Sequence, residues 1–491
     1  MAALLLTASI LAAVVSIGAV HTRSYTPDIF FVLNGAWRVL NGQIPHIDFY
    51  SPFGPLIFLL VAAGLKLSSF GVEGFGYGIA IAGLLVAALG YRLITRRLPP
   101  LASVFLLIDL VLLAVTPYPL GMDPERGSHA MSYNRIGYAL LALVLLESFH
   151  PARHRLDAFL AGATAVALLF LKASFFFVAC PLLAISLLGK PFPKHRLAPL
   201  ASGALLSLAI FLAYLRFDIP AILADLRIAA AARSGALSFS LVIDSLWIHS
   251  FDFMRLAAIL FIARRHDFLS LFYALAVLGG SLLLMLTNNQ GPVLPLVDVI
   301  VLLLAAAAPR TKPAIIVALL ALAPAFWQAG RDVYGLVQAA MEPAAAPTLS
   351  SPHLARLHLY PYQGPSPEPE GTNGRSFVHH INDGLRLLSQ HARPGETVVT
   401  PELGDPFAYA ALRPPAPGGF VLLAYGYTFN DQHRPSNDRL FAGADLILLP
   451  KLTVMTGTDF AHHARLFFPY IQAHFHTIAE SDEWFLYRKR R

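Results

Sequence analysis

Four acidic residues stand in polar connections between long apolar runs, where they could do chemistry. Asp28 and Asp48 lie in the first connection, and Asp123 and Glu125 lie together in the second. Polar side chains are costly at membrane depth, so those that gather at the ends of apolar runs are candidates for a site. If the two connections converge, Asp28 and Asp123 could hold a divalent cation such as Mg²⁺ or Mn²⁺, or the acidic groups could divide the work of base and phosphate recognition. The alternative is that they are solvated loop residues.

Asp28 stands where a helix is expected to begin. The run Thr26-Pro27-Asp28 is typical of a helix start, with Thr at the N-cap, Pro at the first helical position and Asp at the second. The helix is amphipathic and ends at Gly42, so we expect it to lie along the membrane surface. Its polar face carries Asn34, Arg38 and Asn41. The helix dipole favours the ionised carboxylate, so Asp28 is either a reactive group or a residue that only stabilises the helix.

Cationic and amide side chains at the same ends of the apolar runs could bind a phosphate. Lys172 lies between two short apolar runs, where it can act as a point charge for a phosphate or snorkel toward the headgroups. Arg135 enters the span that follows the second connection. A further polar turn offers donors for a phosphate or for hydroxyls, although a turn before Pro292 needs such residues anyway. That turn consists of Asn288, Asn289 and Gln290. The connection 217–252 adds Asp218, Arg233, Asp244, His249 and Asp252, with weak specificity.

The composition indicates the class of protein. The chain has 491 residues, of which 56% are hydrophobic and 13% are charged, whereas soluble domains carry about 25% charged residues. This argues against a water-soluble enzyme and predicts a polytopic α-helical protein in a lipid bilayer. The formal charge of +7 comes from residues at the ends of apolar segments, which argues against nucleic acid as a partner. Cys180 is the only cysteine, which excludes a disulfide within the chain and a cysteine metal site.

About eleven apolar runs are long enough to cross or nearly cross a bilayer. They cover residues 2–20, 74–94, 100–116, 134–149, 157–171, 174–189, 198–216, 246–263, 268–286, 292–308 and 313–328. Five basic clusters lie between them, namely Arg92/Arg96/Arg97, Arg153/Arg155, Lys190/Lys194/Arg196, Arg264/Arg265 and Arg310/Lys312. Because Lys and Arg accumulate on the cytoplasmic side of membrane proteins, we expect all five clusters to face the cytoplasm.

A further apolar run at residues 55–69 conflicts with this charge pattern if it crosses the membrane. We therefore expect a short juxtamembrane helix on the outer leaflet, within a first outer loop that covers residues 21–73. The N-terminus is then cytoplasmic, in the inner or plasma membrane, and the C-terminal part is extracytoplasmic. In the alternative, 55–69 is an ordinary span and 2–20 is oriented the other way.

The composition changes after the eleventh run. We divide the chain into a transmembrane module at 1–328, a linker at 329–375 that contains a Pro/Ser/Gly-rich stretch, and a domain at 376–491. In this last part, short apolar runs at 396–400, 420–424 and 444–449 are interleaved with predicted helices at 377–390 and 459–474. Strands interleaved with helices predict a small α/β domain, which lies in the periplasm in this scheme.

The first outer loop resembles that of the GT-C superfamily of integral-membrane glycosyltransferases, whose members include the protein O-mannosyltransferases and the aminoarabinose transferase of lipid A. The resemblance rests on an acidic residue, an amphipathic helix, the pattern G-x-x-P-x-x-D-F-x-x-P-x-G-P-L and an apolar juxtamembrane stretch. The residues of the pattern are Gly42, Pro45, Asp48, Phe49, Pro52, Gly54, Pro55 and Leu56. The resemblance covers residues 1–328 in architecture, and its sequence-specific parts are 25–75 and 123–138.

The resemblance implies a donor sugar that is carried on a polyprenyl phosphate and transferred on the outer face of the membrane with inversion. By analogy, Asp28 is the catalytic general base, and Asp123 or Glu125 fills a second acidic position that binds a metal or the acceptor, for which Asp48 is a further candidate. Lys172 contacts the donor phosphate, assisted by Arg135 and the polar turn at 288–290. The acceptor hydroxyl belongs to a glycolipid, a polysaccharide or a protein.

The sequence contains no nucleotide-binding or zinc motif, in keeping with a donor that is already activated. The alternative function is a secondary transporter or flippase for a lipid-linked or polar solute. Such a protein would place paired charges midway through its spans and would show repeated halves with broken helices. Here the ionisable residues gather at the outer edge, and no repeat is visible. In a third possibility the C-terminal domain binds a partner and the spans only anchor it, but eleven spans are excessive for an anchor.

Overall fold

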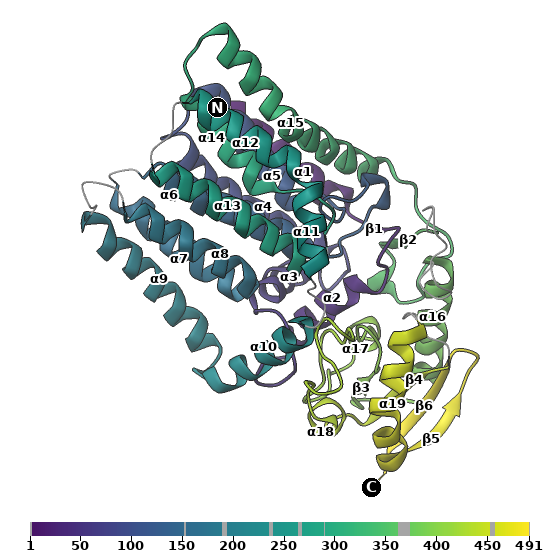
Figure 1. Cartoon of the computed structure of the whole chain (residues 1–491). Coiled ribbons are helices and arrows are strands. Elements are labelled where there is room, and N and C mark those ends of the chain that lie inside the picture. Colours follow the sequence, from purple (N-terminus) through teal and green to yellow (C-terminus); the bar gives the residue numbers. More distant parts are fainter. Residues whose placement is uncertain are drawn as a thin grey trace.

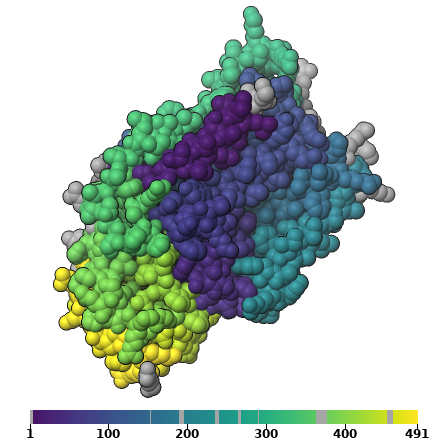
Figure 2. All heavy atoms as spheres, turned by 180° about the vertical axis from the view of Figure 1, so that it is seen from behind, coloured from purple at the N-terminus to yellow at the C-terminus, as the bar shows by residue number. Residues whose placement is uncertain are grey.

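Long helices form a bundle, and shorter elements together with a C-terminal domain cover one of its ends (Figure 1). The computed structural model describes residues 2–151, 154–188, 194–234, 239–263, 268–288, 290–361, 374–451 and 457–490. Figure 2 shows from behind how the C-terminal domain, in green to yellow, lies against the first outer loop in purple.

The bundle contains a helix at each of the eleven apolar runs identified in the sequence. Its helices are α1 (Ala2–Ile17), α4 (Gly74–Ile94), α5 (Pro100–Val115), α6 (Ser132–Phe149), α7 (Arg155–Leu171), α8 (Ala173–Ser186), α9 (Lys194–Tyr214), α11 (Phe239–Ile248), α12 (Ser250–Ile262), α13 (Phe268–Thr287), α14 (Pro295–Ala307) and α15 (Lys312–Met341). The run predicted at 246–263 is broken, because α11 and α12 meet at an angle of 53°. The prediction of a mostly helical architecture is confirmed.

By helix length and hydropathy, fewer spans are identified in the structure than the eleven apolar runs of the sequence predict. Among the described helices, four are long and apolar enough to cross a membrane, or up to five if the bent pair α11 and α12 counts as one span. Several others, such as α5 and α14, are apolar but shorter. The number of eleven spans therefore stays a prediction.

A buried ionic network joins the ends of four helices of the bundle. Asp157, at the start of α7, pairs with Arg92 at 2.9 Å and with Arg97 at 3.1 Å. Glu147, near the end of α6, pairs with Arg196 of α9 at 2.5 Å and with Arg97 at 3.8 Å. Residues from two of the predicted basic clusters therefore meet at the same end of the bundle, opposite to the end of α7 that reaches Lys172.

The other residues of the predicted basic clusters do not take part in this network as far as the described ranges extend. Arg153, Lys190, Arg264 and Arg265 lie outside the described residues. Lys194, Arg310 and Lys312 begin or precede helices α9 and α15.

Small residues allow α9 to pack directly on α7. A Cβ atom at Gly162 of α7 would lie 2.1 Å from the backbone oxygen of Leu200, and one at Gly203 of α9 would lie 2.0 Å from that of Phe159. Close backbone approach at small residues is a common way for helices to associate in membranes. This contact holds α9 to the bundle although most of its surface is exposed.

Several short elements lie between the bundle and the C-terminal domain. They are β1 (Val20–Thr22), α2 (Asp28–Leu40), α3 (Leu56–Leu67), η1 (Pro124–Arg126), α10 (Ile219–Ser234), η2 (Pro352–Leu354) and β2 (Leu357–Leu359). The helix predicted at 55–69 is α3. Strands β1 and β2 pair in parallel with Val20 opposite Leu357, which ties the first outer loop to the segment that follows α15.

The C-terminal domain contains a four-stranded sheet of order β3-β4-β6-β5. Its elements are α16 (Gly374–His391), β3 (Val398–Val399), α17 (Phe407–Ala410), α18 (Asn437–Phe441), β4 (Leu446–Pro450), α19 (Gly457–His474), β5 (Phe475–Glu480) and β6 (Trp484–Lys489). Strands β3 and β4 are parallel, and the other pairs are antiparallel. The two predicted helices correspond to α16 and α19.

Two boundaries differ from those predicted from the sequence. Helix α15 continues to Met341, so the segment predicted as a linker at 329–375 begins as a helix. The apolar run at 420–424 is not a strand of the sheet, because its backbone pairs with the first outer loop. Tyr50 donates its backbone N–H to Gly419 at 3.0 Å and accepts one from Val421 at 3.2 Å.

Helix α2 does not lie along a membrane surface with an exposed polar face. Asn34 and Arg38, on the face predicted to be polar, are both fully buried. Asn34 donates its side-chain amide to the backbone oxygen of Phe420 at 3.1 Å, and Arg38 donates to that of Gly418 at 2.7 Å. The C-terminal domain therefore covers Asn34 and Arg38 and accepts a hydrogen bond from each of them.

Candidate active site

Asp28 begins helix α2 at the end of the bundle that the C-terminal domain covers (Figure 1). Pro27 rather than Thr26 occupies the N-cap position, and no side chain caps the helix. The Asp28 carboxyl is largely shielded from water, and this burial raises its pKa to about 7. Burial therefore acts against the stabilisation that the helix dipole gives to the ionised carboxylate. A carboxyl with this pKa is suited to exchange a proton at neutral pH.

Lys172 occupies the break between α7 and α8 in an extended conformation. Its Nζ lies 5.2 Å from the centre of the Tyr133 ring and 5.8 Å from that of Phe53. Burial, together with the nearby cation Arg233, lowers the pKa of Lys172 to about 7. An ammonium placed over aromatic rings with no ion-pair partner described is a group that an anion would stabilise.

Tyr133 is the neighbour that Asp28 and Lys172 share. Burial, together with the negative charge of Asp28, raises the pKa of Tyr133, and its ring lies beneath the Lys172 ammonium. The ring of Phe53 packs against Tyr133 with centroids 4.7 Å apart, and that of Phe31 follows at 5.5 Å from Phe53. The structure thus brings the predicted base and the predicted phosphate ligand to one cluster of aromatic rings.

Gly54 explains how the first outer loop reaches Lys172. A Cβ atom at Gly54 would lie 2.1 Å from the backbone oxygen of Phe170, two residues before Lys172. Only a residue without a side chain allows this approach. The glycine of the sequence pattern therefore places Phe53 beside the break between α7 and α8.

Arg233, which the sequence indicated only with weak specificity, is the cation that affects Lys172, and it packs on Tyr427, which the sequence did not single out. Arg233, at the end of α10, donates to the backbone oxygen of Leu286 at 2.9 Å and lies 4.4 Å from the centre of the Tyr427 ring. Arg233 is one of several polar residues in its connection, and Tyr427 comes from the C-terminal domain. No local signal in the sequence connects either of them with Lys172.

The polar turn predicted at 288–290 lies next to the backbone group that Arg233 contacts. Asn288 is buried, and neither polar atom of its side chain has a hydrogen-bond partner within the described ranges. Gln290 donates to the backbone oxygen of Val293 at 3.2 Å, and Asn289 lies outside the described residues. A buried amide without a partner is costly unless a ligand or water satisfies it, so Asn288 is the member of this turn that best fits a binding role.

Arg135 has a different environment from Lys172. Its guanidinium donates to the backbone oxygens of Tyr118 at 2.6 Å and Leu113 at 3.0 Å, and it pairs with Asp332 of α15 at 3.1 Å. Each of its three nitrogens thus has a protein partner. This arrangement gives Arg135 a structural task, joining α6 to α15, and we do not include it among the phosphate ligands.

The remaining acidic candidates do not gather around Asp28. Asp48 accepts the backbone N–H of Ile44 at 2.7 Å and thereby closes its own turn. Asp123 and Glu125 are exposed, and Asp123 accepts the backbone N–H of Glu125 at 3.1 Å at the start of η1. Among the residues that the structure describes, no group of three His, Cys, Asp or Glu side chains could hold a metal ion. The geometry therefore gives the predicted pair of Asp28 and Asp123 no support as a cation site.

A cavity of about 850 Å³ lies in the C-terminal domain, away from Asp28. Its lining includes His353, His379, Asn382, Arg386 and Arg413. The backbone oxygen of Arg413 accepts a hydrogen bond from the Trp37 indole at 2.8 Å, and Trp37 is more than two turns along α2 from Asp28. This cavity is separate from the cluster around Lys172.

Comparison with solved structures shows that the chain shares the fold of ArnT from Cupriavidus metallidurans. The lipid A aminoarabinose transferase ArnT from Cupriavidus metallidurans, in its apo state, aligns with a TM-score of 0.53 and 12% identity over 99% of this chain and 97% of ArnT. The same protein bound to undecaprenyl phosphate aligns with a TM-score of 0.51 and 13% identity over the same shares of the two chains. No protein-family model and no curated protein sequence matches the chain. The resemblance drawn from the first outer loop is thus confirmed at the level of the fold.

Proposed function

We propose that this protein is a membrane glycosyltransferase that moves a sugar from a polyprenyl-phosphate carrier to an acceptor hydroxyl. The observation that carries the proposal is the row of aromatic rings, Phe31, Phe53 and Tyr133, that joins the helix begun by Asp28 to the Lys172 ammonium. A base and a cation that share one site are what transfer from a phosphate leaving group needs. The fold shared with ArnT, one of whose structures contains undecaprenyl phosphate, supports this class of donor.

The proposed arrangement in the membrane follows the charge pattern. The eleven predicted spans correspond to α1, α4 to α9, the bent pair α11 and α12, and α13 to α15. The ionic network of Arg92, Arg97 and Arg196 marks the cytoplasmic end, because basic residues accumulate on that side. Asp28, Lys172 and the C-terminal domain are then extracytoplasmic, and the N-terminus is cytoplasmic.

Asp28 acts as the general base in the proposed reaction. Its ionised carboxylate takes the proton of the acceptor hydroxyl while the hydroxyl oxygen forms a bond to the anomeric carbon of the sugar. The bond between that carbon and the phosphate oxygen breaks, and its electron pair stays on the phosphate. A single displacement of this kind inverts the anomeric configuration. General-base assistance is typically worth about 10²–10⁴-fold in rate.

Lys172 stabilises the charge that grows on the departing phosphate, with Arg233 as a second cation and Asn288 as a neutral donor. Because the charge of Arg233 lowers the pKa of Lys172, an anion bound near both would relieve their repulsion. Because the leaving group is a phosphate already attached to the sugar, the reaction needs no nucleotide. The acceptor hydroxyl is that of a glycolipid, a polysaccharide or a protein.

Sugar transfer by the full-length protein in lipid nanodiscs tests this proposal. The assay supplies an undecaprenyl-phosphate-linked sugar with candidate acceptors and compares the wild type with Asp28→Asn and with Asp123→Asn. Asp123 is a matched control, because it is an exposed acid in a neighbouring outer connection. We expect Asp28→Asn to lose at least about 100-fold in rate and Asp123→Asn to stay within about twofold of the wild type.

Equal activity of Asp28→Asn and the wild type would contradict the assignment of the base. The alternative of a secondary transporter or flippase predicts a different result. In that case no sugar is transferred, and a polar solute or the lipid-linked sugar crosses the membrane of vesicles that contain the protein.

A further inference from the structure

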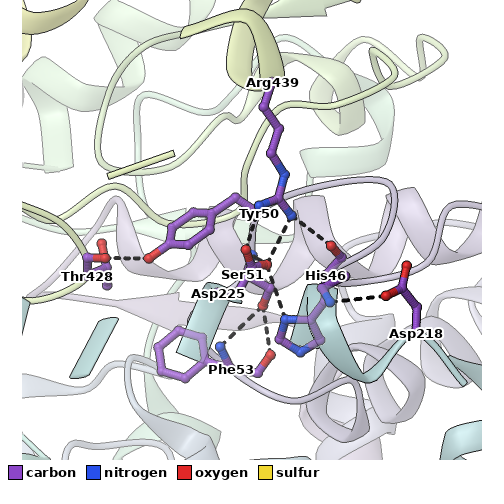
Figure 3. Close-up of polar contacts among 9 residues, drawn as sticks. His46, Tyr50, Ser51, Phe53, Asp218, Asp225, Thr428 and Arg439 are labelled. Carbon is purple, nitrogen blue, oxygen red and sulfur yellow. Dashed lines mark hydrogen bonds and ion pairs between the residues drawn. The ribbon is translucent and has the colours of Figure 1, made fainter. Parts of the chain in front are cut away.

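Asp225 of α10 connects three parts of the chain that are far apart in sequence (Figure 3). Its fully buried carboxylate accepts hydrogen bonds from the backbone N–H of Ser51 at 3.1 Å and from His46 Nδ1 at 3.2 Å. Because a carboxylate only accepts, Nδ1 of His46 carries the proton. Arg439 of α18 donates to both carboxylate oxygens, at 2.6 and 3.2 Å, in a bidentate ion pair.

Arg439 binds the first outer loop as well as α10. Its second nitrogen donates to the backbone oxygen of His46 at 2.7 Å. Nearby, the Tyr50 hydroxyl donates to the backbone oxygen of Thr428, the residue after Tyr427. The C-terminal domain thus holds the first outer loop and α10 through the same few residues.

The groups that Asp225 fixes lead directly to the surroundings of Lys172. Ser51 accepts the backbone N–H of Phe53 at 3.3 Å and donates to its backbone oxygen at 2.8 Å, so the bond to Asp225 also fixes the ring beside Lys172. Along α10, Arg233 follows Asp225 by eight residues, which is about 12 Å of helix. The C-terminal domain therefore contacts α10 at two points, through Arg439 at Asp225 and through Tyr427 at Arg233.

We propose that Asp225 and Arg439 are positioning residues for the donor phosphate. Their ion pair holds α10 and the turn of Ser51 and Phe53 against the C-terminal domain. This fixes Arg233 at Tyr427 and the Phe53 ring beside Lys172. The inference rests on the proposed function, because it takes Lys172 and Arg233 as the phosphate ligands. It assigns the C-terminal domain a part in donor binding, although none of its charged side chains needs to touch the phosphate.

Binding of undecaprenyl phosphate to the full-length protein in nanodiscs tests this inference. We expect Arg439→Gln and Asp225→Asn to raise the Kd by about tenfold, which corresponds to about 1.4 kcal/mol. Arg439→Lys, which keeps the charge but not the bidentate geometry, should lose less. Arg465→Gln is the matched control, since Arg465 is an exposed arginine of the same domain that pairs with Asp431 at 2.5 Å. Its Kd should stay within about twofold of the wild type.

A coupling measurement separates positioning from a general loss of structure. In an Arg233→Gln background, Arg439→Gln should raise the Kd by clearly less than about tenfold, because one of the two groups through which it acts, Arg233 and Phe53, is already absent. A full tenfold loss in that background would overturn the inference. In kinetic assays the donor KM of Arg439→Gln should rise while kcat at saturating donor is retained.

The remaining outcomes are also decisive. If the wild type binds undecaprenyl phosphate and the Asp225 and Arg439 variants bind it equally well, the positioning role is wrong while the proposed function stands. If the wild type does not bind it, the proposed function fails and this inference fails with it. If Arg439→Gln does not fold, Arg439→Lys decides, because its side chain is 28% exposed. An unchanged Kd in that variant would contradict the inference.

Discussion

The two groups proposed to act in transfer both titrate near neutral pH, so the pH dependence of the reaction is a strong test. Burial raises the pKa of Asp28 to about 7 and lowers the pKa of Lys172 to about 7. Asp28 works as a base only when ionised, above its pKa, and Lys172 binds the phosphate only when protonated, below its pKa. The value of kcat/KM should therefore follow a bell-shaped curve with its maximum near pH 7.

The height of this curve follows from the two ionisation equilibria. With both pKa values near 7, about one quarter of the molecules have the correct protonation state at pH 7, and about 1% have it at pH 5 or pH 9. The expected fall in kcat/KM is therefore about 25-fold over two pH units on either side. Bound donor raises the pKa of Lys172, so the alkaline limb of kcat should lie at higher pH than that of kcat/KM.

The assay for this prediction is the initial rate of sugar transfer in nanodiscs between pH 5 and pH 9. Lys172→Arg keeps a positive charge throughout this range, since the guanidinium does not deprotonate. Its alkaline limb should disappear while the acid limb, set by Asp28, remains. Lys451→Arg, at a lysine of the C-terminal domain paired with Glu480 at 3.0 Å, is the control and should keep both limbs. A flat profile in the wild type, or an unchanged alkaline limb in Lys172→Arg, would refute the reasoning.

Three further predictions concern stability and packing. Ionisation of Asp28 opposes folding above pH 4 because the folded pKa is the higher one, and complete burial would make this penalty about 4 kcal/mol above pH 7. Partial exposure of the carboxyl reduces this penalty to about 2 kcal/mol. Asp28→Asn should therefore melt at a higher temperature than the wild type at pH 8 but not at pH 4. An equal shift of the melting temperature at both pH values would contradict this prediction. Gly54→Ala should cost about 1–3 kcal/mol of stability, because the added methyl group meets the backbone of α7, and it should weaken binding of undecaprenyl phosphate. Gly76→Ala is the control in thermal melts and should be tolerated, because a Cβ atom there would lie 4.0 Å from its nearest neighbour. Arg135→Gln leaves Asp332 buried without its cation and should lower stability by about 3–5 kcal/mol. A change in the donor KM without a loss of stability would contradict this and place Arg135 at the phosphate.

The sequence predicted those features that depend on local patterns. Helix α4 has the limits of the apolar run at 74–94, because hydropathy is a property of consecutive residues. Lys172 was identifiable because a single lysine between apolar runs is unusual. The position of Gly54 within the pattern was also visible, although its contact with Phe170 was not.

Features that depend on contacts between distant segments were not predictable. The polar face of α2 indicated exposure to solvent, yet the C-terminal domain buries Asn34 and Arg38. The pKa of Asp28 was inferred from the helix dipole alone, whereas its shift comes from the groups packed around the carboxyl. Arg233 and Tyr427 approach each other across almost two hundred residues, and no periodicity or spacing connects them.

The position of a bound lipid phosphate tests the central claim most directly. A structure of the full-length protein in nanodiscs with undecaprenyl phosphate would show it. We predict that the phosphate lies between the Lys172 ammonium and the Arg233 guanidinium, within about 4 Å of both, and that the Asp28 carboxylate faces the same space. A phosphate bound elsewhere, for example in the cavity of the C-terminal domain, with Lys172 unliganded, would contradict the account.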